Sequence, residues 1–236
     1  MHRGFEDELD KLRTRLVRMG SIVEEQVEFA FRALLEGNSE LAKIVQERDD
    51  KVDKLDIKID KQCQRIFALQ QPVASDLRLL LAAIKINNEL ERIGDMASNV
   101  AGPVLVIENL QTLALELGME RITQAAYRMV KASLDAFINN DPELAKHILP
   151  TDDTVDNLEK EIISEVIKRM KTDKSYIDAG VALIDILRQI ERIADHATNI
   201  AENVIFLIEA RLVRHRQIED DGNILDAELF NDDTGL

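Results

Sequence analysis

The sequence has no tryptophan, one cysteine and only 4% aromatic residues, and it contains just 9 glycines and 4 prolines. A single cysteine excludes an internal disulfide, which fits a reducing compartment. The scarcity of glycine and proline leaves few residues that interrupt helices. The 236 residues are 45% hydrophobic and rich in Ala, Leu and Ile, so we predict an all-α protein with a sizeable core and no sheet.

Long apolar runs are also missing. Residues 100–107 form one of the longest, and this stretch includes Gly102 and Pro103. It is far shorter than the roughly 20 residues that cross a bilayer as a helix. The first residues turn acidic at once and lack the apolar core of a signal peptide. We therefore expect a cytoplasmic protein without direct membrane insertion.

Basic residues are outnumbered, with 30 Lys and Arg against 45 Asp and Glu, and the formal net charge is −15. Such a charge argues against broad attraction to nucleic acid or anionic lipid, and against free phosphate as a ligand. It suits cations or a basic protein partner. Acidic residues crowd the last stretch, residues 216–236, which we interpret as an acidic C-terminal tail.

A nine-residue segment occurs twice, 100 residues apart. Residues 91–99 read Glu-Arg-Ile-Gly-Asp-Met-Ala-Ser-Asn, and residues 191–199 read Glu-Arg-Ile-Ala-Asp-His-Ala-Thr-Asn. Each copy places two carboxylates four residues apart, which on a helix puts them about 6 Å apart on one face. Like charges at that spacing repel, so the repetition indicates a compensating cation. Arg92 and Arg192 are candidates, although they lie around the side of the helix, and a bound metal is the other.

The two halves match beyond this motif, because residues 40–43 resemble 143–146 and residues 52–55 resemble 155–158. Asn38 and Asp141 are suited to helix caps, and Pro72 and Pro142 to first helical positions. We predict six long helices, at about residues 3–36, 39–70, 72–101, 119–138, 142–171 and 173–213, with a connector at 108–118. The repeat favours two similar halves over one continuous core, as two tandem pseudo-symmetric three-helix bundles at residues 1–110 and 111–215.

The second predicted helix carries its own acidic row, which is largely repeated in the fifth. Residues 49, 53, 56 and 60 are all Asp, and their counterparts at an offset of 103 are Asp152, Asp156, Glu159 and Ile163. Antiparallel helices joined by a short turn bring residues at equal distances from the turn side by side. We therefore predict two four-carboxylate sets, namely Asp49, Asp53, Glu91 and Asp95 in the first half and Asp152, Asp156, Glu191 and Asp195 in the second.

All-oxygen ligand sets suit Mg²⁺, Mn²⁺, Ca²⁺ or iron and disfavour a structural zinc site. Asn99 and Asn199 are candidates for weak ligands or outer hydrogen-bond partners of these sites. A single acidic pair of this kind is usually only a solvated helix face, but its coupled recurrence favours metal binding. His196 points away from the acidic row and is expected to be partner-facing or partly buried. No Ser/His/Asp set, phosphate-binding glycine loop or zinc-type cysteine cluster is present, so we expect no enzyme.

The doubled motif within a doubled three-helix repeat, together with the opening residues 5–12, resembles the PhoU family of phosphate-transport regulators. The resemblance covers about residues 1–215. It implies a cytoplasmic, homodimeric negative regulator of phosphate uptake and phosphate-starvation signal transduction. It further implies contacts with the ATPase subunit of the phosphate transporter and with a membrane sensor histidine kinase. It also implies metal clusters at Glu91, Asp95, Glu191 and Asp195, with the ion left open among Fe, Mn, Mg and Zn.

Two other interpretations are kept. One is a ferritin-like di-iron carboxylate enzyme or metal-storage protein, although that fold places Glu-x-x-His ligands inside a four-helix bundle. The other is a helical scaffold that binds no metal. Metal-dependent oxidation of a substrate would favour the enzyme, and loss of partner binding on changing the acidic faces would favour a regulator over a scaffold.

Overall fold

The computed structural model describes residues 2–213, and their side chains from residue 4 onward. This part of the chain is helical and contains no strand. The predicted acidic tail, residues 216–236, lies outside the described residues. The elements in chain order are α1 (His2–Glu36), α2 (Ser39–Gln70), α3 (Ala74–Ala101), η1 (Gly102–Leu105), α4 (Leu110–Glu116), α5 (Glu120–Asn139), α6 (Pro142–Ile148), η2 (Leu149–Thr151), α7 (Asp152–Thr172), η3 (Lys174–Tyr176) and α8 (Ile177–Glu209).

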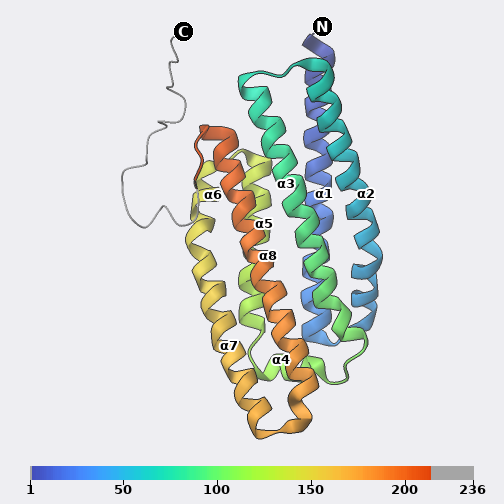
Figure 1. Cartoon of the computed structure of the whole chain (residues 1–236), viewed down its shortest axis with the longest axis vertical. Helices are drawn as coiled ribbons and strands as arrows, with labels where there is room; N and C mark the ends of the chain where they lie inside the picture. The colour runs from blue at the N-terminus through green and yellow to red at the C-terminus, as the bar shows by residue number, and fades with distance from the viewer. Residues whose placement is uncertain (1, 214–236) are drawn as a thin grey trace, which may run out of the picture.

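The helices form two bundles that lie side by side (Figure 1). Helices α1, α2 and α3 pack together in one, while α5, α7 and α8 pack together in the other, with α6 leading into α7. This arrangement confirms the predicted all-α fold of two three-helix bundles. The most extensive contact between any two helices joins α3 to α8, so the two motif-bearing helices meet at the centre of the molecule.

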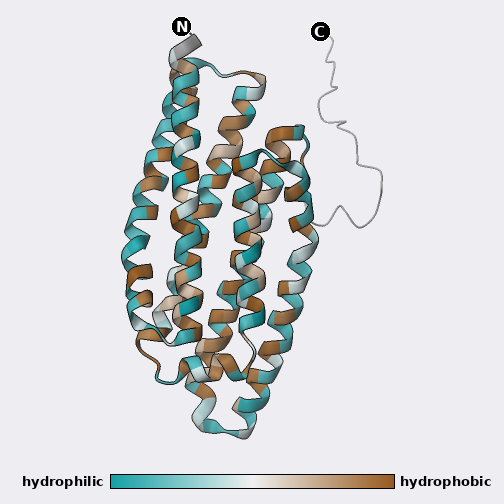
Figure 2. Cartoon of the chain, turned by 180° about the vertical axis from the view of Figure 1, so that it is seen from behind, coloured by the Kyte–Doolittle hydropathy of each residue, from teal (hydrophilic) through white to brown (hydrophobic). Residues whose placement is uncertain are grey.

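Helix formation follows from the apolar stripe on each helix. On α1, Leu12, Leu16, Met19 and Val23 recur at spacings of three and four, and each is at most 1% exposed. Figure 2 shows such residues as stripes along the helices. The buried side chains of the two bundles merge into one cluster, where the repeat alone favoured separate halves. The domain limits at residues 110 and 215 stay a prediction. None of the helices described is long and apolar enough to span a membrane.

The predicted helix breaks at the first turn of each half are confirmed. Gly37, with φ of 65°, follows the end of α1, and the side chain of Asn38 accepts hydrogen bonds from two backbone N–H groups of α2, each at 3.1 Å. Asp141 caps α6 in the same way at 2.9 Å, with Pro142 at the start of that helix. These equivalent caps fix the same register between the first two helical segments of each half.

The fifth predicted helix, residues 142–171, is wrong as a continuous element. It is divided into α6 and α7 by the short 3₁₀ segment η2, which contains Pro150. Proline lacks a backbone N–H, and its ring clashes with the carbonyl four residues before it, so an α-helix cannot pass through this position undisturbed. The break makes Asp152 the first residue of α7.

Two further boundaries differ from the sequence prediction. The third helix begins at Ala74 rather than at Pro72, and Val73 precedes it without a side-chain cap. The last helix begins only at Ile177, after η3, and ends at Glu209 rather than near residue 213. Neither difference shifts the repeated motifs, which lie well inside α3 and α8.

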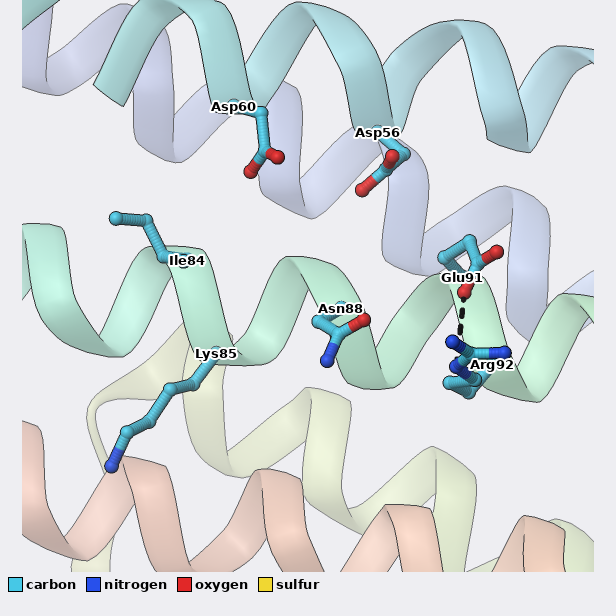
Figure 3. Close-up of a pocket in the computed structure, with 7 residues that line it drawn as sticks. All are labelled: Asp56, Asp60, Ile84, Lys85, Asn88, Glu91 and Arg92. Atoms are coloured by element: carbon cyan, nitrogen blue, oxygen red, sulfur yellow. Dashed lines mark ion pairs between the residues drawn. The ribbon is translucent and has the colours of Figure 1, made fainter. Parts of the chain in front are cut away.

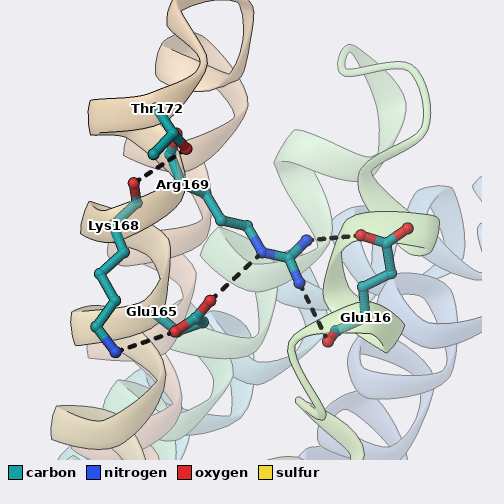
Figure 4. A network of polar contacts seen from close by, with 5 residues as sticks. All are labelled: Glu116, Glu165, Lys168, Arg169 and Thr172. Atoms are coloured by element: carbon teal, nitrogen blue, oxygen red, sulfur yellow. Dashed lines mark hydrogen bonds and ion pairs between the residues drawn. The ribbon is translucent and has the colours of Figure 1, made fainter.

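The predicted connector between the halves holds a short helix, α4, that is tied to α7 (Figure 4). The Nη1 atom of Arg169 donates to Glu116 Oε2 at 2.6 Å, and its Nη2 donates to the Glu116 carbonyl at 3.5 Å. Glu165 Oε1 lies 3.9 Å from the Nε atom of the same arginine. The connector is therefore fastened to the second bundle.

Arg13 joins the two bundles directly. This α1 side chain donates from Nη2 to the carbonyl of Ile138 at 3.1 Å and to Asn140 Oδ1 at 2.8 Å, both at the end of α5. Its guanidinium also lies 5.9 Å from the centre of the Phe137 ring. Since the last carbonyls of a helix have no partner within the helix, Arg13 supplies one from the other bundle.

We predict that Arg13→Met lowers the free energy of unfolding by about 1 kcal/mol, because carbonyl groups at the end of α5 lose their donor. Urea denaturation followed by circular dichroism measures this change. Arg18→Met, at an exposed arginine on the same helix, is the control and should change stability little. Equal effects of the two substitutions would contradict the bridging role of Arg13.

Candidate metal site

Three carboxylates meet between α2 and α3. Asp53, Glu91 and Asp95 each offer an oxygen atom, and these atoms all lie within 4.8 Å of one another. Among residues 4–213, no other group of three or more His, Cys, Asp or Glu ligands is as close. The predicted register of the two helices is therefore confirmed for these residues, which we call the first acidic triad.

Partial burial strengthens the electrostatic repulsion between the carboxylates of the triad. Burial first, and the charge of Asp95 second, raise the pKa of Glu91. Burial and the charge of Asp49 likewise raise the pKa of Asp95. The Oε2 atom of Glu91 is buried and accepts no hydrogen bond, and Arg92 Nε lies 3.5 Å from it. Because the Arg92 side chain is 55% exposed, water screens its charge and it offsets only part of the repulsion within the triad.

Asp49, the fourth member of the predicted set, lies next to the triad rather than within it. Its charge acts on Asp95, and its Oδ1 atom accepts a hydrogen bond of 3.2 Å from Gln26 on α1. Sequence reasoning missed Gln26. The signal that could have found it is a glutamine within the apolar stripe of α1, where it is 0% exposed.

The acidic surface continues from the triad into a shallow pocket of about 320 Å³ (Figure 3). Glu91 belongs to both, and Asp56 and Asp60 continue the row along α2. Burial first, then Asp60, raises the pKa of Asp56. Asn87 on α3, also missed from the sequence, donates to Asp56 Oδ1 at 2.6 Å and to Asp60 Oδ1 at 3.4 Å. The pocket lining consists of Asp56, Asp60, Ile84, Lys85, Asn88, Glu91 and Arg92.

The second half gathers its acidic residues around Glu191. Burial is the largest cause that raises the pKa of this group to about 7, and the neighbouring carboxylates add to it. Those neighbours, in decreasing order of effect, are Asp195, Glu159, Asp156 and Asp152. The predicted second set therefore surrounds Glu191, with Glu159 added. No three of its described ligand atoms are as close together as those of the first acidic triad.

Asn99 and Asn199 make their hydrogen bonds outside the acidic rows, and their role as weak ligands or outer partners of a metal stays a prediction. Asn199 Nδ2 donates to Glu89 Oε2 on α3 at 3.1 Å, and Asn99 Nδ2 donates to Gln189 Oε1 on α8 at 3.5 Å. Successive residues of an α-helix are rotated by about 100° around its axis. The asparagine eight residues after the first carboxylate therefore lies roughly 80° around the helix from that carboxylate. These side chains therefore link the two bundles.

His196 belongs to the same junction. Its side chain is 21% exposed, and its Nδ1 atom lies 2.5 Å from Glu89 Oε2. The expectation that it is partly buried and away from the acidic row is confirmed. In the first repeat Met96 stands at this position, so the junction between α3 and α8 is not symmetric.

Residues 16–104 and 119–204 each match the family model of the PhoU domain. The chain belongs to the PhoU family. The two matched segments include both repeated motifs, which confirms the resemblance noted from the sequence.

Individual PhoU proteins are similar in sequence to this chain over most of their length. The chain is 40% identical over 212 residues to a phosphate-specific transport system accessory protein PhoU homolog of Pseudomonas aeruginosa, which covers 89% of this chain and 88% of that protein. The accessory protein PhoU of Escherichia coli is 35% identical over 211 residues, with 89% and 88% covered. These names describe accessory proteins of phosphate transport rather than enzymes.

Solved PhoU structures share the fold. The crystal structure of PhoU from Pseudomonas aeruginosa superimposes with a TM-score of 0.81 at 39% identity, covering 88% of this chain and 100% of that one. The phosphate transport system regulatory protein PhoU from Streptococcus pneumoniae gives 0.80 at 28% identity, with 89% and 99% covered. The metal role of the acidic residues in this PhoU-family chain stays a prediction.

We predict that Glu191→Gln stabilises the metal-free protein at pH 8. Folding raises the pKa of Glu191 from 4.5 to about 7, so the unfolded chain loses this proton at a lower pH than the folded one. The free energy of unfolding of the wild type therefore falls as pH rises from 4.5 to 7, and stays reduced above 7. The neutral amide removes this penalty, and the difference should vanish near pH 4.

Thermal unfolding in the presence of a chelator, at pH 4 and pH 8, measures this effect. Glu47→Gln, at an exposed position of α2, is the matched control and should not change the melting temperature at either pH. A lower melting temperature of Glu191→Gln than of the wild type at pH 8 would contradict the prediction.

Proposed function

We propose that the chain is a metal-binding regulator of phosphate uptake and phosphate-starvation signalling. It acts in the cytoplasm as a homodimer and restrains the phosphate transporter and its sensor kinase through protein contacts, without catalysis. The observation that carries this proposal is the pairing of two acidic clusters on the motif helices of a PhoU fold. Relatives that share most of the chain are named accessory proteins of phosphate-specific transport.

The chemistry of the first acidic triad supports a cation ligand. Ions such as Mg²⁺ and Ca²⁺ bind oxygen at about 2.0–2.6 Å, so one ion can be shared by oxygens that lie within 4.8 Å of one another. The buried Glu91 Oε2 atom, which accepts no hydrogen bond, is a group that such an ion would satisfy. Asp53, Glu91 and Asp95 would hold it, with Asp49 beside them.

The second site would use Glu191 and Asp195 from α8 together with Asp152 and Asp156 from α7. Like charges and partial burial oppose ionisation of Glu191 in the metal-free protein, and a cation reverses both effects. The bound ion supplies positive charge that ties α7 to α8, as it ties α2 to α3 in the first half. All-oxygen ligands favour iron, manganese or magnesium over a structural zinc site.

The position of the clusters favours a regulator over a ferritin-like enzyme. Asp95 is 39% exposed, so the first site opens to solvent rather than lying inside a four-helix core. No histidine of the described residues joins either cluster, and His196 is engaged with Glu89 instead. A protein with a net charge of −15 does not attract phosphate itself, so phosphate status would arrive through its partners.

Metal analysis tests the first part of the proposal. Protein purified without chelator should contain bound metal by elemental analysis, and Asp95→Ala combined with Asp195→Ala should remove most of it, because each half loses a ligand. Asp50→Ala, at an exposed aspartate of α2 that is not a member of the triad, is the control and should retain the metal. Unchanged metal content in the double variant would overturn metal binding at these positions.

A pull-down from phosphate-replete cells tests the regulatory part. The tagged full-length chain should recover the ATPase subunit of the phosphate transporter and the membrane sensor kinase, identified by mass spectrometry. Cells that express the tag alone are the control. Recovery of neither partner from repeated experiments would contradict regulation by direct contact, whatever the metal content of the protein.

A further inference from the structure

Gln26 lies where all three helices of the first bundle meet, and it is 0% exposed. Its Nε2 atom lies within hydrogen-bond distance of four acceptors. Two are backbone carbonyls, of Val45 at 3.4 Å and Gly94 at 3.3 Å. The other two are Asp49 Oδ1 and Ser98 Oγ, each at 3.2 Å. This α1 side chain thus contacts both helices that carry the first acidic set.

The amide group of Gln26 has two hydrogens for these four acceptors, so it can serve only two at a time. A carboxylate accepts a stronger hydrogen bond than a neutral carbonyl or hydroxyl, which favours Asp49. The Oε1 atom of Gln26 is buried and accepts no hydrogen bond. The side chain is therefore oriented by what its nitrogen donates to, and the charge of the Asp49 carboxylate that it contacts raises the pKa of Asp95.

Gly94 within the motif provides the space for this contact. A Cβ atom at this position would lie 3.3 Å from Val52 Cγ1 and 3.6 Å from Gln26 Oε1. The first contact is tighter than ordinary van der Waals distance, so α3 approaches α1 and α2 more closely than an alanine there would allow without adjustment. The second motif carries Ala194 at the equivalent position.

In the second half a different side chain donates a hydrogen bond to the acidic set. The helix caps align α1 with α5 at an offset of 103, so Met129 occupies the place of Gln26. Met129 is 4% exposed and has no N–H group to donate. Instead Thr198 Oγ1 donates to Asp152 Oδ1 at 3.4 Å, within α8 and α7 themselves. A buried amide thus serves the first acidic set, and a threonine hydroxyl serves the second.

We propose that Gln26 is a positioning residue for the first metal site only: it holds Asp49 in place as the fourth carboxylate, which makes the two sites of the chain inequivalent. This inference rests on the proposed metal binding and adds a residue outside the repeated motif. Hydrogen-bond partners of metal ligands typically change metal affinity by 10-fold to 100-fold when they are removed.

Each site can be measured alone in the full-length chain. Glu191→Gln with Asp195→Asn leaves the first site, and Glu91→Gln with Asp95→Asn leaves the second. Titration of the metal-free proteins with Mn²⁺, followed by electron paramagnetic resonance, gives the dissociation constant. In the first background Gln26→Met should weaken Mn²⁺ binding about tenfold. In the second background the same substitution should leave binding unchanged, which a general loss of structure would not do.

A rescue variant copies the second half. Gln26→Met combined with Ser98→Thr reproduces the pair of Met129 and Thr198, in which the threonine hydroxyl donates to Asp152, and should recover part of the lost affinity. Asp49→Ala removes the acceptor of the Gln26 hydrogen bond together with the carboxylate. It should weaken the first site as well, and Gln26→Met should add little further loss in this variant, because the interaction that it breaks is already absent.

Unchanged first-site affinity in Gln26→Met, or equal weakening of both sites, would overturn the inference. Fully additive losses from Gln26→Met and Asp49→Ala would also overturn it, and Gln26→Leu, which likewise lacks the amide N–H, serves for this comparison if Gln26→Met does not fold. Absence of Mn²⁺ binding by the wild-type chain at both sites would instead overturn the proposed function.

Discussion

The antiparallel contact between α3 and α8 is the interaction on which the rest of the structure depends. It is the most extensive contact between two helices, and it joins the two bundles along the helices that carry the repeated motif. Polar pairs mark its centre, where Glu89 meets His196 and Asn199, and Gln189 meets Asn99. With these faces turned toward each other, the carboxylates of each motif face α2 or α7 instead.

Carboxylates that lie close together repel one another and destabilise the fold, and this arrangement brings them together around Glu91 and around Glu191. Each cluster combines partial burial with several like charges, and the effect is larger around Glu191 than around Glu91. Surface arginines offset little of it because water screens them. Such clusters lower the free energy of unfolding of the metal-free protein, yet both halves of the sequence contain one. Destabilising charge of this kind is common where it is needed to bind a ligand.

Register explains how much of the site could be predicted from the sequence. Counting residues from the turn between α2 and α3 found Asp53, Glu91 and Asp95, because rigid helices joined by a short turn transmit position reliably. The hydrogen bond from Asn99 to Gln189 could not be predicted, because α8 lies far along the chain. Gln26 was missed for the same reason, since its role exists only when α1 packs against both acidic helices. The helix break at Pro150 was missed although proline is itself a strong signal.

That break has an electrostatic consequence for the second cluster. Since η2 ends at Thr151, Asp152 lies in the first turn of α7, whereas its counterpart Asp49 lies inside the long helix α2. The first turn of a helix has backbone N–H groups without intrahelical partners and a partial positive charge, which favour a carboxylate there. Asp152 is only 8% exposed, and the peptide dipoles of its own helix offer it the stabilisation that a separate amide side chain gives to Asp49.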